Sequence, residues 1–191
     1  MPTLDALFAL VHGRGNARVR FNIETKLSPL APEETASPEA LMRAVLVVVA
    51  KNGMQVRVMV QSFDWCTLAL SQQRAPAIPD VALTVRQHFL VNLGVDRPTA
   101  GLRLADHGGS VPRLVQAAGG RVWSPFHLAL REALVVDAQA IGLTVNPWTV
   151  NAPEQIDRYA GWGVEHIISD LADRVLQLLK KYGQTAGTAA Q

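Results

Sequence analysis

Residues 20–26, Arg-Phe-Asn-Ile-Glu-Thr-Lys, place an amide, a carboxylate and an ammonium group at alternate positions. Because strand side chains alternate between two faces, Asn22, Glu24 and Lys26 share one face, while Phe21 and Ile23 share the other. Burying the polar row is costly unless its groups pair with each other, a metal or a ligand. Glu24 can hold Mg²⁺ or Ca²⁺ through oxygen, and an ion pair with Lys26 is the alternative. This pattern predicts a functional site at the end of the strand.

A second candidate group follows the next expected strand. Alternation along residues 56–63 predicts that Val56, Val58 and Val60 pack outward against helices, whereas Gln61 and Phe63 point toward the opposite, interior face. We therefore expect Gln61 and Phe63 to line a pocket, with core packing as the alternative for the phenylalanine.

Further candidates lie in the second half of the chain. Trp148 shares a face with Thr144 and Asn146, and an inward tryptophan offers a flat apolar wall for a glycerol or head group, or packs as a core aromatic. Asn151 and Asp170 are expected to cap the helices that follow them.

The single cysteine and the remaining aromatic and imidazole groups receive structural interpretations. Cys66 cannot form an internal disulfide and is expected to be a small core residue. No pair among the remaining residues has the spacing of metal ligands. We therefore expect structural or surface roles for Trp123, Trp162, His88, His107, His127 and His166.

Strands and helices alternate along the whole chain, which implies parallel strands joined by crossover helices. The expected strands are 20–26, 56–61, 81–85, 121–124, 143–149 and 166–169, and the expected helices are 3–11, 38–52, 65–73, 111–118, 128–141, 153–160 and 172–182, with residues 86–109 irregular. The polar candidates fall at the carboxyl ends of these strands, as in a β/α barrel. A doubly wound open sheet is the alternative, but it usually shows a glycine-rich loop after its first strand, and none is present.

Length and composition set the protein class. With 191 residues, of which 49% are hydrophobic, the chain is long enough for one domain. The net charge of +2 and the lack of a basic stripe exclude a nucleic-acid partner. The start lacks a secretory signal, and the longest apolar run, 44–50, is shorter than the roughly 20 residues that span a bilayer. We expect a cytoplasmic chain without stable membrane insertion.

Three segments occur in the order typical of one enzyme family. FNIETK (21–26) resembles its third strand, with a glutamate metal ligand and a lysine two residues on, and VQSFDWCTL (60–68) resembles its fourth strand and the start of the next helix. LTVNPWTVNAPEQIDRYAGWGVEHIISDLADRV (143–175) resembles its seventh and eighth strands. Together with the helix that begins at Pro2-Thr3-Leu4, these segments resemble the glycerophosphodiester phosphodiesterase family over nearly the whole chain.

The resemblance implies an incomplete TIM-type barrel with about six of its eight strand–helix units. Family members carry His-Arg-Gly and Pro-Glu-Asn motifs on a first strand, and Glu-x-Asp and His-Asp motifs on a second. All of these are absent here, so we expect an N-terminally truncated domain at 1–183, followed by a disordered tail at 184–191. A parent protein could be exported, because its signal would precede this chain.

The implied function is hydrolysis of glycerophosphodiesters to glycerol 3-phosphate and an alcohol, in lipid metabolism. The resemblance assigns Glu24 to a divalent cation, Mg²⁺ or Ca²⁺, and Lys26 to the phosphoryl group, while Gln61, Phe63 and Trp148 contact substrate. Because the family histidines are absent, we expect this chain alone to be nearly inactive and to hold the cation weakly. A non-catalytic relic that binds another molecule is the alternative. Open sheet edges predict self-association.

Overall fold

The computed structural model describes residues 2–28, 32–87, 90–93 and 99–182. Its α-helices are α1 (Leu4–Gly13), α2 (Pro38–Lys51), α3 (Trp65–Arg74), α4 (Val111–Ala117), α5 (Glu132–Ala140), α6 (Pro153–Gly161) and α7 (Ala172–Leu179). Its strands are β1 (Phe21–Thr25), β2 (Val58–Ser62), β3 (Asp80–Thr84), β4 (Arg86–Gln87), β5 (Leu90–Val91), β6 (Val122–Pro125) and β7 (Thr144–Val145). Short 3-10 turns are η1 (Pro32–Glu34), η2 (Gln55–Arg57), η3 (Leu104–His107), η4 (His127–Ala129) and η5 (Lys180–Tyr182).

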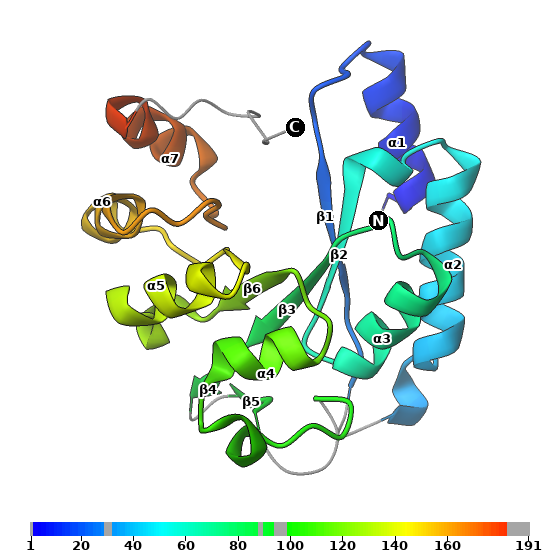
Figure 1. The fold of residues 1–191 in the computed structure, drawn as a ribbon. Coiled ribbons are helices and arrows are strands. Elements are labelled where there is room, and N and C mark those ends of the chain that lie inside the picture. The colour runs from blue at the N-terminus through cyan, green and yellow to red at the C-terminus, as the bar shows by residue number, and fades with distance from the viewer. Residues whose placement is uncertain (1, 29–31, 88–89, 94–98, 183–191) are drawn as a thin grey trace.

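Five parallel strands form one sheet in the order β1-β2-β3-β6-β7, which is also their order along the chain. A doubly wound sheet would reverse direction at a switch point, and no such reversal occurs among the described strands. Helices connect the parallel strands, as Figure 1 shows. The prediction of an incomplete β/α barrel is confirmed, and the open-sheet alternative is wrong.

Local sequence signals fix where several helices begin. The side-chain oxygens of Thr3, Ser37, Asp64 and Ser110 each accept a hydrogen bond from a backbone N–H in the first turn of α1, α2, α3 and α4, at 3.0–3.4 Å. Each such cap satisfies a backbone donor that has no partner within the helix. Helix α2 then ends before Gly53, whose φ of +63° favours glycine.

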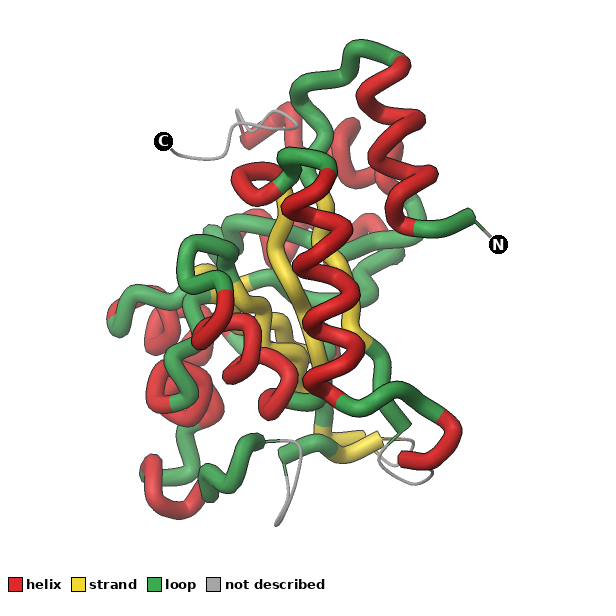
Figure 2. The backbone as a smooth tube through the Cα atoms, turned by 90° about the vertical axis from the view of Figure 1, so that its right-hand side faces the viewer, coloured by secondary structure: helices red, strands yellow, loops and turns green. Residues whose placement is uncertain are grey.

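The main apolar core lies between the sheet and the helices. Helix residues such as Phe8, Val49 and Trp65 pack there against alternate strand residues such as Val60 and Val145, and all five side chains are buried. Figure 2 looks onto the helix-covered side of the sheet, with the long helix α2 in front of part of it. The other strand residues therefore face the barrel interior, where the predicted site lies.

The predicted sixth strand, residues 166–169, is wrong as a strand, although this segment lies beside the chain that follows β7. The Ile168 N–H donates to Pro147 O at 3.0 Å, and the Val150 N–H donates to Ile168 O at 2.8 Å. A regular ladder fails because the Glu165 carboxylate accepts the Val145 N–H at 2.8 Å, and Pro147 has no N–H to donate. The edge of the sheet is therefore held by isolated bonds.

Two other expected boundaries differ in the second half. The predicted strand 143–149 is regular only over β7, followed by a single parallel bridge between Phe126 and Trp148. The predicted helix 128–141 begins late, at Glu132, after the turn η4. The stretch 86–109, expected to be irregular, contains the antiparallel pair β4–β5 and the turn η3.

Two side chains predicted to be buried are exposed. Val56 has 82% of its surface exposed, because it lies in η2, which Arg57 holds by donating to the carbonyls of Asn16 and Val19 at 2.8 and 2.9 Å. Cys66 follows the buried Trp65 on α3 and turns about 100° away from the sheet. The core role predicted for Cys66 is therefore wrong.

Within the part of the chain that the structure describes, every helix is too short or too polar to cross a bilayer. The expected tail at 184–191 lies outside the described residues, as does His88.

Candidate active site at the carboxyl ends of the strands

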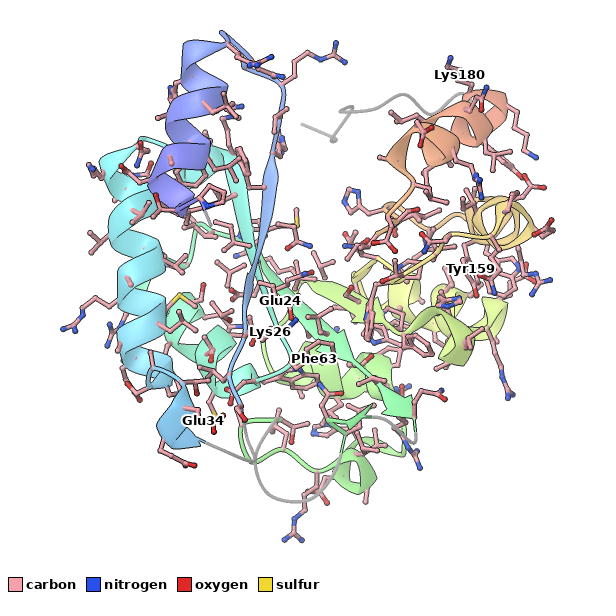
Figure 3. The ribbon with its side chains drawn as sticks, turned by 180° about the vertical axis from the view of Figure 1, so that it is seen from behind. Glu24, Lys26, Glu34, Phe63, Tyr159 and Lys180 are labelled. Atoms are coloured by element: carbon pink, nitrogen blue, oxygen red, sulfur yellow. The ribbon has the colours of Figure 1, made fainter. Side chains whose placement is uncertain are left out.

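The inner face of β1 and β2 carries the polar row predicted from the sequence. The parallel register places Glu24 beside Gln61, and the Asn22 amide donates to the Gln61 side-chain oxygen at 2.6 Å. Figure 3 shows Glu24, Lys26 and Phe63 at the same end of the sheet. The structure therefore brings together the site residues predicted on the first two strands.

The strand ends themselves are fixed by hydroxyl groups. Ser62, which is fully buried, donates through Oγ to Thr25 O at 2.9 Å, and its Oγ accepts the Asp64 N–H at 3.1 Å. These two bonds tie the end of β1 to the start of α3. They also set the backbone positions of Lys26 and Phe63, the next residues after each strand.

Glu24 and Lys26 form the ion pair that was the alternative to metal binding. Lys26 Nζ lies 3.6 Å from Glu24 Oε1, and their side chains are 80% and 29% exposed, respectively. At that exposure the ion pair contributes at most about 1 kcal/mol to stability. A ligand that binds either side chain more strongly can therefore break the pair. The pairing therefore leaves both side chains available to a phosphate or a cation.

The described residues do not by themselves make a metal site. Divalent cations such as Mg²⁺ and Ca²⁺ take several oxygen ligands, and across residues 2–28, 32–87, 90–93 and 99–182 no group of three or more His, Cys, Asp or Glu side chains could hold one. Glu24 can supply one ligand only.

Aromatic side chains form the wall on the other side of the candidate site. The Trp148 ring lies 5.3 Å from Phe63 and 5.2 Å from Phe126, centre to centre. The Trp148 indole N–H donates to Ser124 O at 2.9 Å, and the Ser124 hydroxyl donates to Asn146 O at 2.6 Å. The structure thus joins Phe63 and Trp148, which sequence reasoning treated separately, and adds Phe126.

Asn92 is a positioning residue that sequence reasoning missed. It is 2% exposed; its amide donates to Leu83 O at 2.7 Å and to Phe63 O at 3.2 Å, and its side-chain oxygen accepts the Val85 N–H at 2.8 Å. These bonds tie the ends of β2 and β3 together just behind the aromatic wall. A lone asparagine within an irregular stretch carries no periodic signal that could have indicated this.

Two buried polar atoms near the carboxyl ends of the strands have no hydrogen-bond partner among the described residues. They are Asn146 Oδ1, on the same face as Trp148, and His127 Nδ1. Burial also lowers the pKa of His127, so the neutral imidazole is favoured. His127 packs against Phe126 and Tyr159, which supports its predicted structural role.

Asn151 and Asp170 do not cap the helices that follow them, so that prediction is wrong. The cap positions of α6 and α7 are Ala152 and Leu171, neither of which has a side-chain cap bond. Asn151 instead donates to Asp170 Oδ2 at 2.9 Å and accepts the Asp170 N–H at 3.0 Å. The two side chains thus join the loops after β7 and after residue 168.

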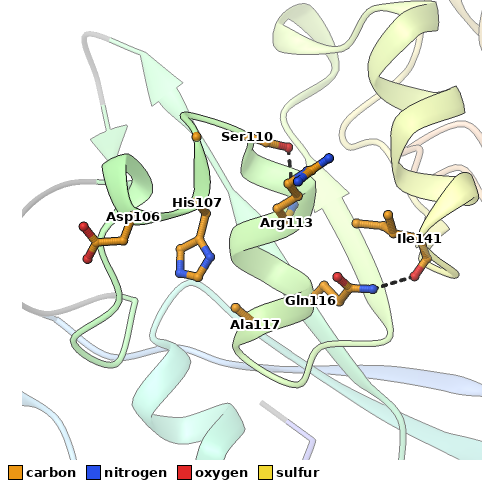
Figure 4. Close-up of a pocket in the computed structure, with 8 residues that line it drawn as sticks. Asp106, His107, Ser110, Arg113, Gln116, Ala117 and Ile141 are labelled. Carbon is orange, nitrogen blue, oxygen red and sulfur yellow. Dashed lines mark hydrogen bonds between the residues drawn. The ribbon is translucent and has the colours of Figure 1, made fainter.

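A hollow of about 860 Å³ lies elsewhere, between η3, α4 and the end of α5. Its lining side chains, which include Asp106, His107, Arg113 and Gln116, are largely exposed, and Figure 4 shows how they are arranged. It belongs to the helical layer and contains none of the site residues described above.

The Glycerophosphoryl diester phosphodiesterase family model matches residues 1–174. A Silicibacter pomeroyi protein assigned to these phosphodiesterases is 30% identical with a TM-score of 0.79, and the match covers 96% of this chain and 58% of that one. The match to a Parabacteroides distasonis glycerophosphodiester phosphodiesterase has 19% identity and a TM-score of 0.69, and it covers 96% of this chain and 66% of that one. An Oleispira antarctica phosphodiesterase was solved with the product sn-glycerol-3-phosphate. Its match has 14% identity and a TM-score of 0.69, and it covers 94% of this chain and 61% of that one.

The two matches below 25% identity show the fold alone. The chain spans less than two thirds of the length of each of these three structures. No curated protein matches it. Because the family model covers most of the sequence, the chain belongs to the glycerophosphoryl diester phosphodiesterase family.

Proposed function

We propose that this chain forms part of a phosphoric diester hydrolase that converts glycerophosphodiesters to glycerol 3-phosphate and an alcohol in lipid metabolism. Family membership over residues 1–174 supports the reaction class. The observation that carries the proposal is the Glu24–Lys26 pair, only 3.6 Å apart at the carboxyl end of β1, where β/α barrels place their reacting groups.

Lys26 is proposed as the contact for the phosphoryl oxygens. Its ammonium group is mostly exposed at the strand end, so it can approach an anion without first being desolvated. A fixed positive charge there offsets the negative charge that develops on the phosphoryl group during displacement.

Glu24 is proposed as one ligand of a divalent cation, Mg²⁺ or Ca²⁺. Since the described residues supply no further cluster, this chain alone would bind the cation weakly, and the other ligands would come from polypeptide outside the described residues.

Gln61, Phe63 and Trp148 are proposed to bind the substrate. The Gln61 amide lies on the same face as Glu24, within reach of hydroxyl groups, and the aromatic pair Phe63–Trp148 presents an apolar surface for glycerol carbons or the head group. The non-catalytic binding role has no supporting observation among the described residues.

The proposal is tested by fusing this chain to the part of the Silicibacter pomeroyi protein that it does not span. The fusion is expected to hydrolyse glycerophosphocholine in a metal-dependent way, whereas the 191-residue chain alone shows little or no turnover because it lacks the family histidines. Acid–base groups contribute on the order of 10²- to 10⁴-fold in rate. Glu24→Gln and Lys26→Met are expected to lower the activity of the fusion at least about 100-fold.

Lys180→Met, which removes an exposed lysine on η5, is the matched control and is expected to leave the rate unchanged. A folded fusion without activity would contradict the proposed reaction, and equal activity of Lys26→Met and the parent fusion would contradict the role of Lys26.

The open edge of the sheet supports a separate proposal, that this chain self-associates. No described strand pairs with β1 on the side away from β2, and unpaired strand edges promote association.

A further inference from the structure

Asn146 carries a buried side-chain oxygen that the fold itself does not use. The residue follows β7 and is only 3% exposed, yet its Oδ1 has no hydrogen-bond partner in the described part of the chain. An acceptor that is buried without a donor loses its hydration and gains nothing in return. Such an atom in a native fold requires an explanation, and a ligand that donates a hydrogen bond is one.

The side chain of Asn146 faces the barrel interior. Val145, the preceding residue, packs in the core between the sheet and the helices, so alternation along the strand turns Asn146 the other way. The Asn146 N–H donates to Trp123 O at 2.9 Å, which continues the parallel register of β6 and β7 by one residue. Trp148, two residues further on, therefore shares this face with Asn146.

Two donors around Asn146 are already engaged elsewhere. The Ser124 hydroxyl, beside Asn146 on β6, donates to the backbone oxygen of Asn146 at 2.6 Å. The indole N–H of Trp148 donates to Ser124 O at 2.9 Å. A hydroxyl has one hydrogen and an indole has one N–H, so neither group can also serve Asn146 Oδ1. The missing donor therefore comes from a ligand or from water.

Asn146 lies in the same interior row as the proposed phosphoryl contact. Followed from strand to strand, the registers place in one row Lys26, Phe63, Leu83, Ser124 and Asn146. Lys26 after β1 and Asn146 after β7 are its two ends, about 19 Å apart along the sheet at about 4.8 Å per strand spacing. The curvature of the sheet shortens the direct path, since Phe63 and Trp148 touch across it with ring centres 5.3 Å apart. The two ends of the row therefore face each other across the interior.

We propose that Asn146 is a substrate-specificity residue that accepts a hydrogen bond from a free hydroxyl of the glycerol half of the substrate. This inference deepens the proposed function and rests on it. Ionised phosphoryl oxygens only accept hydrogen bonds and a choline head group has no N–H or O–H, whereas each free glycerol hydroxyl can donate one. The phosphoryl group then lies toward Lys26 and the glycerol half toward Asn146.

The surroundings of Asn146 suit a hydroxylated carbon chain. Phe63 and Trp148 are only partly buried and offer apolar surface to the glycerol carbons, while the Asn146 oxygen lies deeper on the same face. A ligand reaches Asn146 past these two rings, whose edge-on contact is weak enough to open. Because a site that hydrogen-bonds a hydroxyl discriminates against analogues without it, the chain is expected to select phosphates that carry a free hydroxyl.

The test compares two phosphates of equal charge and similar size, sn-glycerol 3-phosphate and n-propyl phosphate, which lacks both hydroxyls. Each is titrated into the complete 191-residue chain, and its dissociation constant is determined from the shifts of amide NMR signals. The chain is expected to bind sn-glycerol 3-phosphate about tenfold more tightly. The side-chain amide signal of Asn146 is expected to shift with sn-glycerol 3-phosphate and not with n-propyl phosphate.

Asn146→Leu is expected to reduce the preference to less than about twofold and to leave the affinity for n-propyl phosphate unchanged, because only the hydroxyl loses its acceptor. Circular dichroism checks that the variant folds, which is expected because an apolar group of similar size replaces an unpaired buried oxygen. The matched control is Asn16→Leu, before β1 and at the opposite end of that strand from Lys26. The Asn16 side-chain oxygen accepts the N–H groups of Arg18 and Val19 at 3.0 and 3.1 Å, and this variant is expected to keep the full preference.

Equal affinity of the parent chain for the two phosphates would overturn the proposal and leave water as the partner of Asn146, and so would a lack of binding by either phosphate. An unchanged preference in Asn146→Leu, or an equal loss in Asn16→Leu, would overturn it as well. Turnover by the fusion is measured separately. An active fusion without the hydroxyl preference would overturn this inference alone, whereas hydroxyl-selective binding with an inactive fusion would contradict the proposed reaction and support the contact at Asn146.

Discussion

The indole ring of Trp148 stands edge-on to the phenyl ring of Phe63, with an interplanar angle of 81° and ring centres 5.3 Å apart. This contact joins the loop after β7 to the end of β2, two segments on either side of β3 and β6 in the sheet. It is the only described aromatic contact across the open end of the barrel that includes a residue of β2 or its following loop.

Replacing Trp148 with alanine is expected to lower the free energy of unfolding by about 3 kcal/mol, because the aromatic contacts and the indole hydrogen bond are lost together. Trp148→Phe keeps an aromatic ring but leaves Ser124 O without its donor, and about 1 kcal/mol is expected. Urea unfolding followed by circular dichroism measures both. Leu128→Ala, at a 63% exposed side chain, serves as the control. If Leu128→Ala lowered the free energy of unfolding as much as Trp148→Ala does, the stabilising role of the Trp148 contacts would be contradicted.

The sequence was sufficient to predict the order of the five parallel strands and the seven α-helices, because alternating apolar strands and amphipathic helices report which face of each element is buried. It predicted less well where backbone bonding is decided by neighbours in space. The carboxylate of Glu165 removes the Val145 donor from the edge ladder, and no periodic pattern records that. Val56 fits the alternation of β2 but lies in the turn before it.

Asp80 makes stability depend on pH. It is 3% exposed at the start of β3, and burial raises the pKa of its carboxyl from 3.8 to about 6, against the opposing effects of Ser71, Gln72 and Arg121. A pKa raised in the folded state means that the folded protein binds the proton more tightly. This contribution to stability is therefore present below pH 4 and is lost as the pH rises through about 6.

Asp80→Asn is expected to raise the free energy of unfolding by up to about 3 kcal/mol at pH 8. At pH 4 the change is expected to be small, because the carboxyl of Asp80 is then protonated and neutral, as the amide of asparagine is. Urea titrations across this range measure the difference. Asp106→Asn, at an exposed site, reports the general effect of removing one negative charge. A stabilisation by Asp80→Asn that is independent of pH would argue against titration of Asp80.

Glu165 holds the far edge of the sheet through its side chain. Its carboxylate accepts the Val145 N–H at 2.8 Å and the Gln139 amide at 3.1 Å. Glu165→Ala is expected to lower the free energy of unfolding by about 2 kcal/mol, because it leaves a partly buried donor unpaired, and to speed hydrogen exchange at Val145. Glu154→Ala on the exposed face of α6 should change neither, and unchanged exchange at Val145 in Glu165→Ala would refute this role.

Removing divalent metal is expected to leave the stability of this chain unchanged. Ligand binding raises stability only when the free concentration exceeds the dissociation constant, and Glu24 is a single carboxylate without a described cluster around it. Thermal unfolding with 1 mM Mg²⁺ or Ca²⁺ should therefore match that with EDTA. A melting temperature several degrees higher with metal, and lost in Glu24→Gln, would reveal a more complete site than the described residues form.

The candidate site was predictable from the sequence to the extent that single strands determine it. Alternation placed Asn22 and Glu24 on one face of the first strand and directed Gln61 of the second strand to the interior, and the register makes Glu24 and Gln61 neighbours. Asn92 could not be found in this way, since its role arises from backbone carbonyls of two strands that meet only after folding.

The sequential order of the strands has a consequence for how the molecule opens. Within the five-stranded sheet, each strand is hydrogen-bonded only to the strands next to it in the order β1-β2-β3-β6-β7, so β1 can detach without breaking a strand pair of β3 or β6. Local unfolding should start at the outer strands and proceed inward, with opening free energies that increase from β1 and β7 toward β3. Glu24 lies on one of the two outer strands and Lys26 directly follows it, so opening of β1 would displace both side chains together.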